Sequence, residues 1–133
     1  IEADRARSIK TVLRDVRADN FLLTVRGFGM FARKQGTVVW AGVAPSPALL
    51  HLKEAVDAAL AGAGLPPSTG RFTPHLTLAR LKTGPSSALC AFLKGHAATP
   101  AGTFPVTAFS LFRSVLDPGG AVHTLEEDYP LMG

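Results

Sequence analysis

The apolar positions of the chain follow two periods, and these periods predict its elements. Apolar residues recur every three or four positions in three segments, as in amphipathic helices, at 3–16, 47–62 and 86–94. Strand-like alternation or short apolar runs between turn residues cover 21–31, 37–43, 75–80, 104–116 and 121–125. Because short turns at 34–36 and 117–120 join neighbouring strands into hairpins, we expect an α+β fold with antiparallel sheets.

Several local features refine this expectation. Gly27 and Gly29 predict a bulged or loosened first strand, and glycine and proline make 65–70 a loop. Leu76 and Leu78 alternate with polar residues, so we expect both leucines to face the core. The single cysteine, Cys90, lies in an apolar helical pattern and is expected to be buried.

Composition narrows the class of protein. The 133 residues suit one domain or a compact pair of lobes, and 47% hydrophobic with 18% charged residues is ordinary for a globular protein. A net charge of +4 favours an anionic partner such as RNA or a phosphate ester. No apolar run is long enough to span a membrane, and one cysteine cannot form an internal disulfide, so a cytoplasmic protein is expected.

The segment 71–80, read RFTPHLTLAR, is the strongest candidate for chemistry. Pro74 favours an extended chain, and His75 and Thr77 share one face of the predicted strand, roughly 6.5–7 Å apart along it. An imidazole moves protons near neutral pH, and a hydroxyl can donate to a phosphate oxygen. The alternative is an ordinary strand in which His75 is a satisfied polar residue.

Other residues give weaker signals. Trp40 can stack on a base, although a single tryptophan in an apolar strand is more often part of a core. His51, His96 and His123 have no partner in a recognised metal-ligand spacing, so we expect no metal and no cofactor. A phosphate-binding P-loop, a dinucleotide fingerprint and a nucleophile elbow are also missing from the sequence.

The segment from Arg71 to Arg80 resembles the second signature of the two-histidine (2H) phosphoesterases. The closest resemblance is to the RNA 2′,3′-cyclic phosphodiesterases, also called 2′-5′ RNA ligases. The upstream strands, the 49–65 helix and loop, and the terminal hairpin are similar to the same family. The resemblance implies a bilobal fold with antiparallel sheets flanked by helices. It also implies two His-x-Thr motifs, and only one occurs here, so we expect the first to precede Ile1 and the N-terminal part to be absent.

The resemblance implies a hydrolase that opens an RNA 2′,3′-cyclic phosphate to a 2′-phosphate without a metal or cofactor. His75 would be one half of the acid–base pair, and Thr77 would hold a phosphate oxygen. Arg80 matches the basic position of the motif but would point to the opposite face of a regular strand, so it reaches the phosphate only if the strand bends. Phe31 and Trp40 are expected to select the substrate.

Two alternatives remain beside this enzyme. One imidazole serves poorly as base and acid on opposite sides of one phosphorus, so the chain alone would be weakly active yet still bind a terminal phosphate. A non-catalytic module that binds RNA ends or nucleotides is therefore the main alternative, and a structural fragment without a nucleotide site is the other. For the enzyme and for the binding module we expect a monomer.

Overall fold

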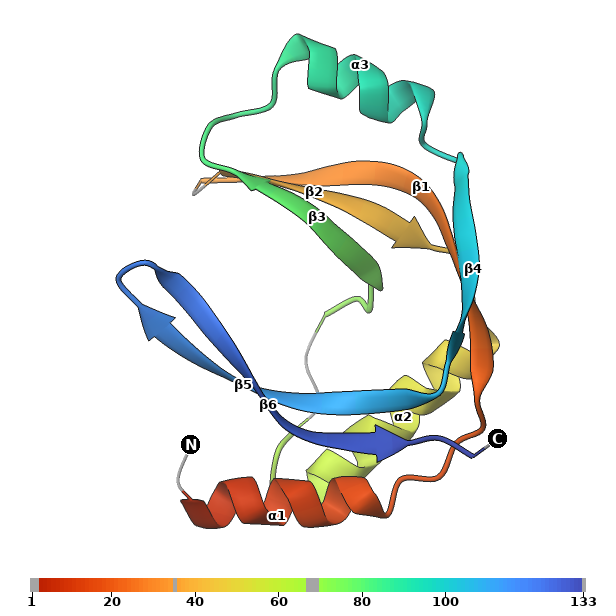
Figure 1. The fold of residues 1–133 in the computed structure, drawn as a ribbon, viewed down its shortest axis with the longest axis vertical. Helices are drawn as coiled ribbons and strands as arrows, with labels where there is room; N and C mark the ends of the chain where they lie inside the picture. The colour runs from red at the N-terminus through yellow and green to blue at the C-terminus, as the bar shows by residue number, and fades with distance from the viewer. Residues whose placement is uncertain (1–2, 35, 67–69, 133) are drawn as a thin grey trace. The chain divides into compact units, whose positions relative to one another are not determined.

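The computed structural model describes residues 3–34, 36–66 and 70–132. It has an α+β fold, as the sequence predicts, and Figure 1 shows its helices and strands. The elements are α1 (Ala3–Arg14), β1 (Phe21–Arg33), β2 (Gly36–Val43), α2 (Pro47–Gly62), β3 (His75–Leu81), α3 (Ser87–Gly95), β4 (Pro100–Val106), β5 (Ala108–Asp117) and β6 (Gly120–Pro130). Gln35 and residues 67–69, which belong to a predicted turn and a predicted loop, lie outside the described residues.

The chain divides into two compact units. Unit 1 consists of Ile1–Phe21, Pro47–Thr69 and Pro105–Gly133, and unit 2 consists of Leu22–Ser46 and Gly70–Phe104. Unit 1 therefore carries α1, α2 and the β5–β6 hairpin, whereas unit 2 carries α3 and most of a four-stranded sheet. Among the described residues, no helix is long and apolar enough to cross a membrane.

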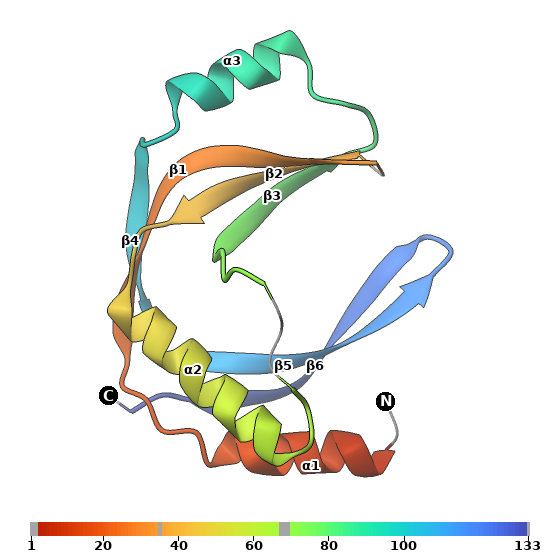
Figure 2. The same cartoon turned by 180° about the vertical axis from the view of Figure 1, so that it is seen from behind.

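Unit 1 is built around apolar side chains from its two helices and its hairpin. Ile9 and Leu13 of α1 are buried against Tyr129 of β6, and Leu52 of α2 forms a second cluster with Ala18 and Leu131. Figure 2 shows α2 close to α1 within this unit. Since the buried positions of α1 are four residues apart, they lie on one side of the helix, as its apolar period predicts.

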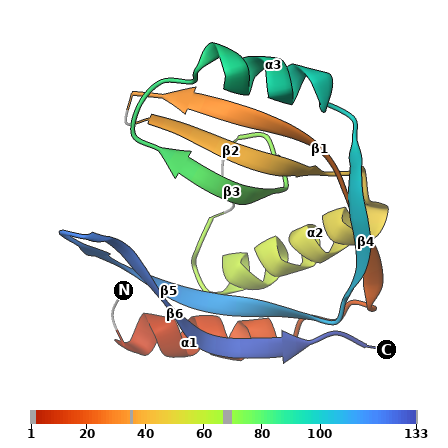
Figure 3. The ribbon, with the colours of Figure 1, turned by 45° about the horizontal axis from the view of Figure 1, so that its top comes forward.

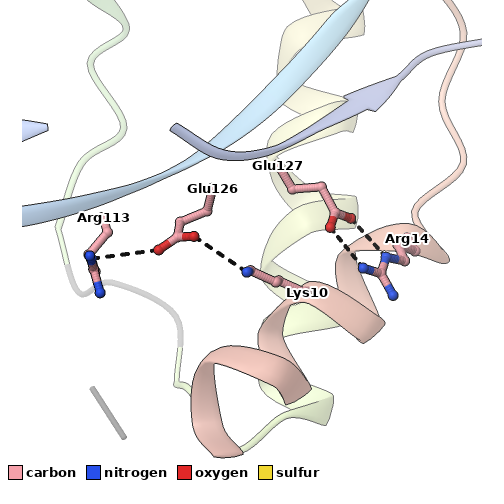
Figure 4. A network of polar contacts seen from close by, with 5 residues as sticks. All are labelled: Lys10, Arg14, Arg113, Glu126 and Glu127. Atoms are coloured by element: carbon pink, nitrogen blue, oxygen red, sulfur yellow. Dashed lines mark hydrogen bonds and ion pairs between the residues drawn. The ribbon is translucent and has the colours of Figure 1, made fainter. Parts of the chain in front are cut away.

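Charged side chains of α1 also join the helix to the hairpin (Figure 4). Arg14 donates two hydrogen bonds of 2.8 Å to the carboxylate of Glu127. Lys10 and Arg113 lie 3.4 and 3.6 Å from Glu126. The hydrogen bond from Arg14 holds the pKa of Glu127 below its ordinary value, and burial raises the pKa of Tyr129, with the charge of Glu127 adding to that effect.

Unit 2 is organised by a sheet whose strand order is β3-β2-β1-β4. Figure 3 shows α3 lying along this sheet. Phe92 of α3 contacts Phe28 of β1, with ring centroids 6.5 Å apart. Ser86 caps α3 by accepting a hydrogen bond from the Leu89 N–H, as serine commonly does at a helix start.

The predicted glycine bulge in β1 is confirmed. The register between β1 and β2 shifts between Val25 and Phe28, and Gly27 has a φ of 79° in the left-handed region. The Gly27 N–H donates a 2.8 Å hydrogen bond to the Thr99 carbonyl. A side chain at this position would meet the Ala97 carbonyl, so glycine is required both by the backbone angle and by the close approach.

Two burial predictions were wrong. Leu76 and Leu78 are 42% and 56% exposed rather than facing a core, because β3 is an edge strand and has a neighbouring strand on one side only. Cys90 is exposed because α3 buries only Leu93 among its described positions. In both segments the apolar period is present, but the described structure covers only part of the apolar face.

The predicted long strand at 104–116 was also wrong. It is two strands that meet at Thr107, with β4 in the four-stranded sheet and β5 in the terminal hairpin. The Thr107 carbonyl accepts a hydrogen bond from the Leu131 N–H. Alternation predicts extended backbone but carries no information on which sheet each half joins.

Candidate functional site

His75 is the first residue of β3, and its ring is oriented by the backbone just before the strand. Its Nδ1 lies 2.7 Å from the Thr73 carbonyl oxygen. Because a carbonyl only accepts, Nδ1 must carry a proton and donate to it. The side chain is exposed, so Nε2 is the nitrogen left to exchange a proton with a bound group.

The strand register places the candidate residues on one face of unit 2. Cross-strand partners share a face of an antiparallel sheet. Trp40 of β2 pairs with Thr77 of β3 and with Gly29 of β1, and His75 pairs with Gly42. Residues two apart on a strand also share a face. His75 and Thr77 therefore lie together with Trp40, as the His-x-Thr spacing predicts.

Arg80 lies on this same face because β3 has a bulge. Trp40 pairs with Thr77 but Val39 pairs with Ala79, so Leu78 has no partner of its own. This extra residue reverses the alternation of the strand, and Arg80 comes opposite Val38. Arg80 was expected on the opposite face of a regular strand, and the bulge makes β3 irregular at the point where that expectation would have applied.

Phe31 joins the same face from β1, where it pairs with Val38. Its ring meets the imidazole of His75 nearly at right angles, at 87°, with 5.2 Å between centroids. Trp40 lies 5.4 Å from Phe31 and 6.4 Å from His75. The guanidinium of Arg33 lies 5.4 Å from the centre of the Phe31 ring. Phe31 and Trp40 therefore make an aromatic cluster beside the exposed imidazole.

We use the name "imidazole face" for the surface made by Gly29, Phe31, Val38, Trp40, Gly42, His75, Thr77 and Arg80.

Two glycines of the imidazole face leave room for neighbouring atoms that approach closely. These glycines were not assigned to the site from the sequence. A Cβ at Gly29 would occupy the space of the Trp40 indole. A Cβ at Gly42 would lie 2.6 Å from the Arg26 carbonyl oxygen. Glycine inside a predicted strand often marks such a close approach, so Gly29 and Gly42 were a signal that could have been used. The carbonyl of Thr73 could not have been found this way.

The other histidines belong to other surroundings. His96 follows α3 and its Nδ1 lies 3.1 Å from the Thr99 hydroxyl. His51 and His123 belong to unit 1, where His123 bonds with Ser114. Among the residues that the structure describes, no group of three or more His, Cys, Asp and Glu side chains could hold a metal ion.

The comparisons with known proteins agree with this fold and motif. A sequence model of the 2′-5′ RNA ligase superfamily matches residues 2–118. The chain belongs to this superfamily.

Curated relatives carry the name RNA 2′,3′-cyclic phosphodiesterase. The protein from Aeropyrum pernix is 31% identical over 121 residues, which are 89% of this chain and 69% of the relative. The Thermus thermophilus relative is 32% identical over a stretch that makes up 85% of this chain and 57% of the relative. The Aquifex aeolicus relative is 28% identical over 99% of this chain and 72% of its own length.

Solved structures share the fold. Escherichia coli LigT complexed with 3′-AMP has a TM-score of 0.75 at 23% identity, with 100% of this chain and 72% of that chain covered. A phosphoesterase structure has a TM-score of 0.77 at 24% identity with the same coverage. LigT has also been solved with ATP and with NADP+. At these identities the likeness concerns the fold, which is that of the 2H phosphoesterases.

Proposed function

We propose that this protein is an RNA 2′,3′-cyclic phosphodiesterase that hydrolyses the cyclic phosphate to a 2′-phosphate. The observation that carries the proposal is the shared face of His75, Thr77 and Arg80, together with a His75 imidazole whose Nδ1 is tied to the Thr73 carbonyl. The family membership and the names of the relatives support the same activity. The chain spans between 57% and 72% of these relatives, so the activity is proposed for the whole protein that contains it.

The chemistry assigns a role to each group. Water attacks phosphorus, the bond from phosphorus to the ribose 3′ oxygen breaks, and the 2′-phosphate remains. A base takes the proton from water and an acid gives one to the departing oxygen, and His75 Nε2 performs one of these two transfers. The Thr77 hydroxyl donates to a non-bridging oxygen, and the Arg80 guanidinium neutralises the charge that develops on the phosphate. This chemistry involves no metal or cofactor.

The rest of the imidazole face suits a nucleotide. Trp40 presents an aromatic surface beside His75 on which a base or ribose can pack. The net charge of +4 favours approach of an RNA end. LigT structures with 3′-AMP, ATP and NADP+ show nucleotides on a related fold. We propose that the protein works as a monomer in the cytoplasm.

Turnover of an RNA ending in a 2′,3′-cyclic phosphate tests this function in the whole protein. His75→Ala is expected to lower kcat/KM by about 10²–10⁴-fold, the usual range for a general acid or base. His51→Ala is the matched control, because His51 is exposed on α2 of unit 1, and it should leave turnover unchanged. Retained turnover in His75→Ala would remove the catalytic role.

One observation favours a second function. The 133 residues contain a single His-x-Thr motif, and one imidazole can bind a terminal phosphate more readily than it can supply both proton transfers. The second candidate is therefore a module that binds RNA ends or nucleotides without hydrolysis. Binding of a 2′-phosphate-ended RNA that requires His75, with no turnover in the whole protein, would favour it.

A further inference from the structure

The orientation of the His75 imidazole has two supports, and only one of them is a hydrogen bond. The bond from Nδ1 to the Thr73 carbonyl selects the protonated nitrogen. A single hydrogen bond nevertheless allows the ring to tilt about the line joining its two atoms. On an exposed edge strand such as β3, a second contact is needed to fix the tilt.

Phe31 makes that second contact. Its ring meets the imidazole at 87° with 5.2 Å between centroids, which is the edge-to-face geometry that aromatic pairs prefer. Gly42 lies opposite His75 on β2 and has no side chain, so the neighbours of the imidazole across the sheet are aromatic rings. Whichever of these two rings presents its edge, a rotation of one ring relative to the other removes the edge-to-face contact.

Phe31 is itself held in place. It is half-buried on β1, with the Trp40 ring 5.4 Å away and the Arg33 guanidinium 5.4 Å from its centre. The side chains of His75, Trp40 and Arg33 therefore all lie close to the Phe31 ring. The sequence-based expectation was that Phe31 and Trp40 both contact the substrate, and these ring contacts give Phe31 a second candidate role beside the imidazole.

We propose that Phe31 is a positioning residue that fixes the tilt of the His75 ring, so that Nδ1 stays on the Thr73 carbonyl and Nε2 stays aimed at the bound group. The catalytic consequence rests on the proposed phosphodiesterase function, whereas the effect on the imidazole does not. Proton transfer is sensitive to misplacement by about 1 Å, which costs up to about a hundredfold in rate.

Phe31→Leu removes the flat ring and keeps an apolar side chain. The matched control is Phe28→Leu, the same change on the same strand, where Phe28 contacts Phe92 of α3 instead of His75. Phe31→Tyr restores a ring. Nitrogen-15 NMR of the imidazole measures the fraction of neutral His75 with its proton on Nδ1, and steady-state kinetics with a cyclic-phosphate RNA separates kcat from KM.

We expect the Nδ1–H fraction to fall in Phe31→Leu and to hold in Phe28→Leu and Phe31→Tyr. The kcat of Phe31→Leu should fall about ten- to a hundredfold at an unchanged KM. An unchanged Nδ1–H fraction in folded Phe31→Leu, or an equal loss in Phe28→Leu, would overturn the proposal. A raised KM with unchanged kcat would also overturn it, because Phe31 would then contact substrate. If the tautomer responds but the wild-type protein has no turnover, Phe31 still positions His75 and the proposed phosphodiesterase function fails.

Discussion

The two units of this chain differ in how their buried apolar side chains are arranged. Both buried apolar clusters among the described residues, which include Leu13 and Leu52, belong to unit 1. Unit 2 leaves every residue of β3 exposed, including His75 and Thr77. We infer that unit 1 contributes more of the packing energy and that unit 2 presents the chemistry. Substitutions in the buried clusters of unit 1 should therefore have the largest effect on stability, whereas substitutions of His75 and Thr77 in unit 2 should alter activity.

The largest expected effect on stability comes from the core of unit 1. Leu13 is 3% exposed and packs with Ile9 and Tyr129. Leu13→Ala should lower the free energy of unfolding by about 2–5 kcal/mol, the usual cost of a cavity at a buried leucine. Urea unfolding measures this change. Leu50→Ala on α2, where the side chain is 47% exposed, is the control and should change stability by less than about 0.5 kcal/mol. Equal effects would contradict the burial of Leu13 in this core.

A smaller effect is expected from adding one methyl group to the imidazole face. Gly29→Ala places a Cβ where the Trp40 indole lies, and overpacking of this kind typically costs about 1–3 kcal/mol. Trp40 is the only tryptophan in the sequence, so its fluorescence reports the displacement directly. Gly84→Ala is the control, since no atom lies within 4 Å of a Cβ there. Unchanged emission in Gly29→Ala would show that the indole does not lie over Gly29.

The smallest expected effect is a change in the acid sensitivity of unit 1. Arg14 holds the pKa of Glu127 below its ordinary value of 4.5 in the folded protein. A carboxyl group whose pKa is lower in the folded than in the unfolded protein stabilises the fold at pH values above its unfolded pKa. This stabilisation is lost as the pH falls through the folded pKa. Glu127→Gln should therefore lower the Tm near pH 7. The decrease of the Tm with falling pH below about pH 4.5 should be smaller in this variant than in the wild type. Glu54→Gln, at an exposed position on α2, is the control. An unchanged pH profile in Glu127→Gln would contradict the ion pair.

The fold was predictable where the signal is local. Apolar periods located α1 and α2 within two residues of their observed ends, and glycine predicted the bulge at Gly27. The break at Thr107 was not predictable, because the alternation continues while the chain passes from one sheet to another. The exposure of Cys90 depends on what packs against α3, which the sequence of the helix does not state.

The site was predictable in part for a related reason. The spacing of His75 and Thr77 fixes their shared face in any regular strand. The face of Arg80 was not predictable, because the bulge at Leu78 uses no glycine and leaves no mark in the sequence. The contact between Phe31 and His75 joins β1 to β3, and only the order of strands in the sheet brings these rings together.

A chemical-shift titration of the 133-residue chain with a nucleoside 2′-phosphate tests most directly whether phosphate chemistry belongs to unit 2. The proposed function predicts saturable shifts confined to the imidazole face, with the largest at His75, Thr77 and Arg80 and none in the core of unit 1. The shifts at this face should disappear in His75→Ala. Shifts confined to unit 1, or no binding at low salt, would contradict the account.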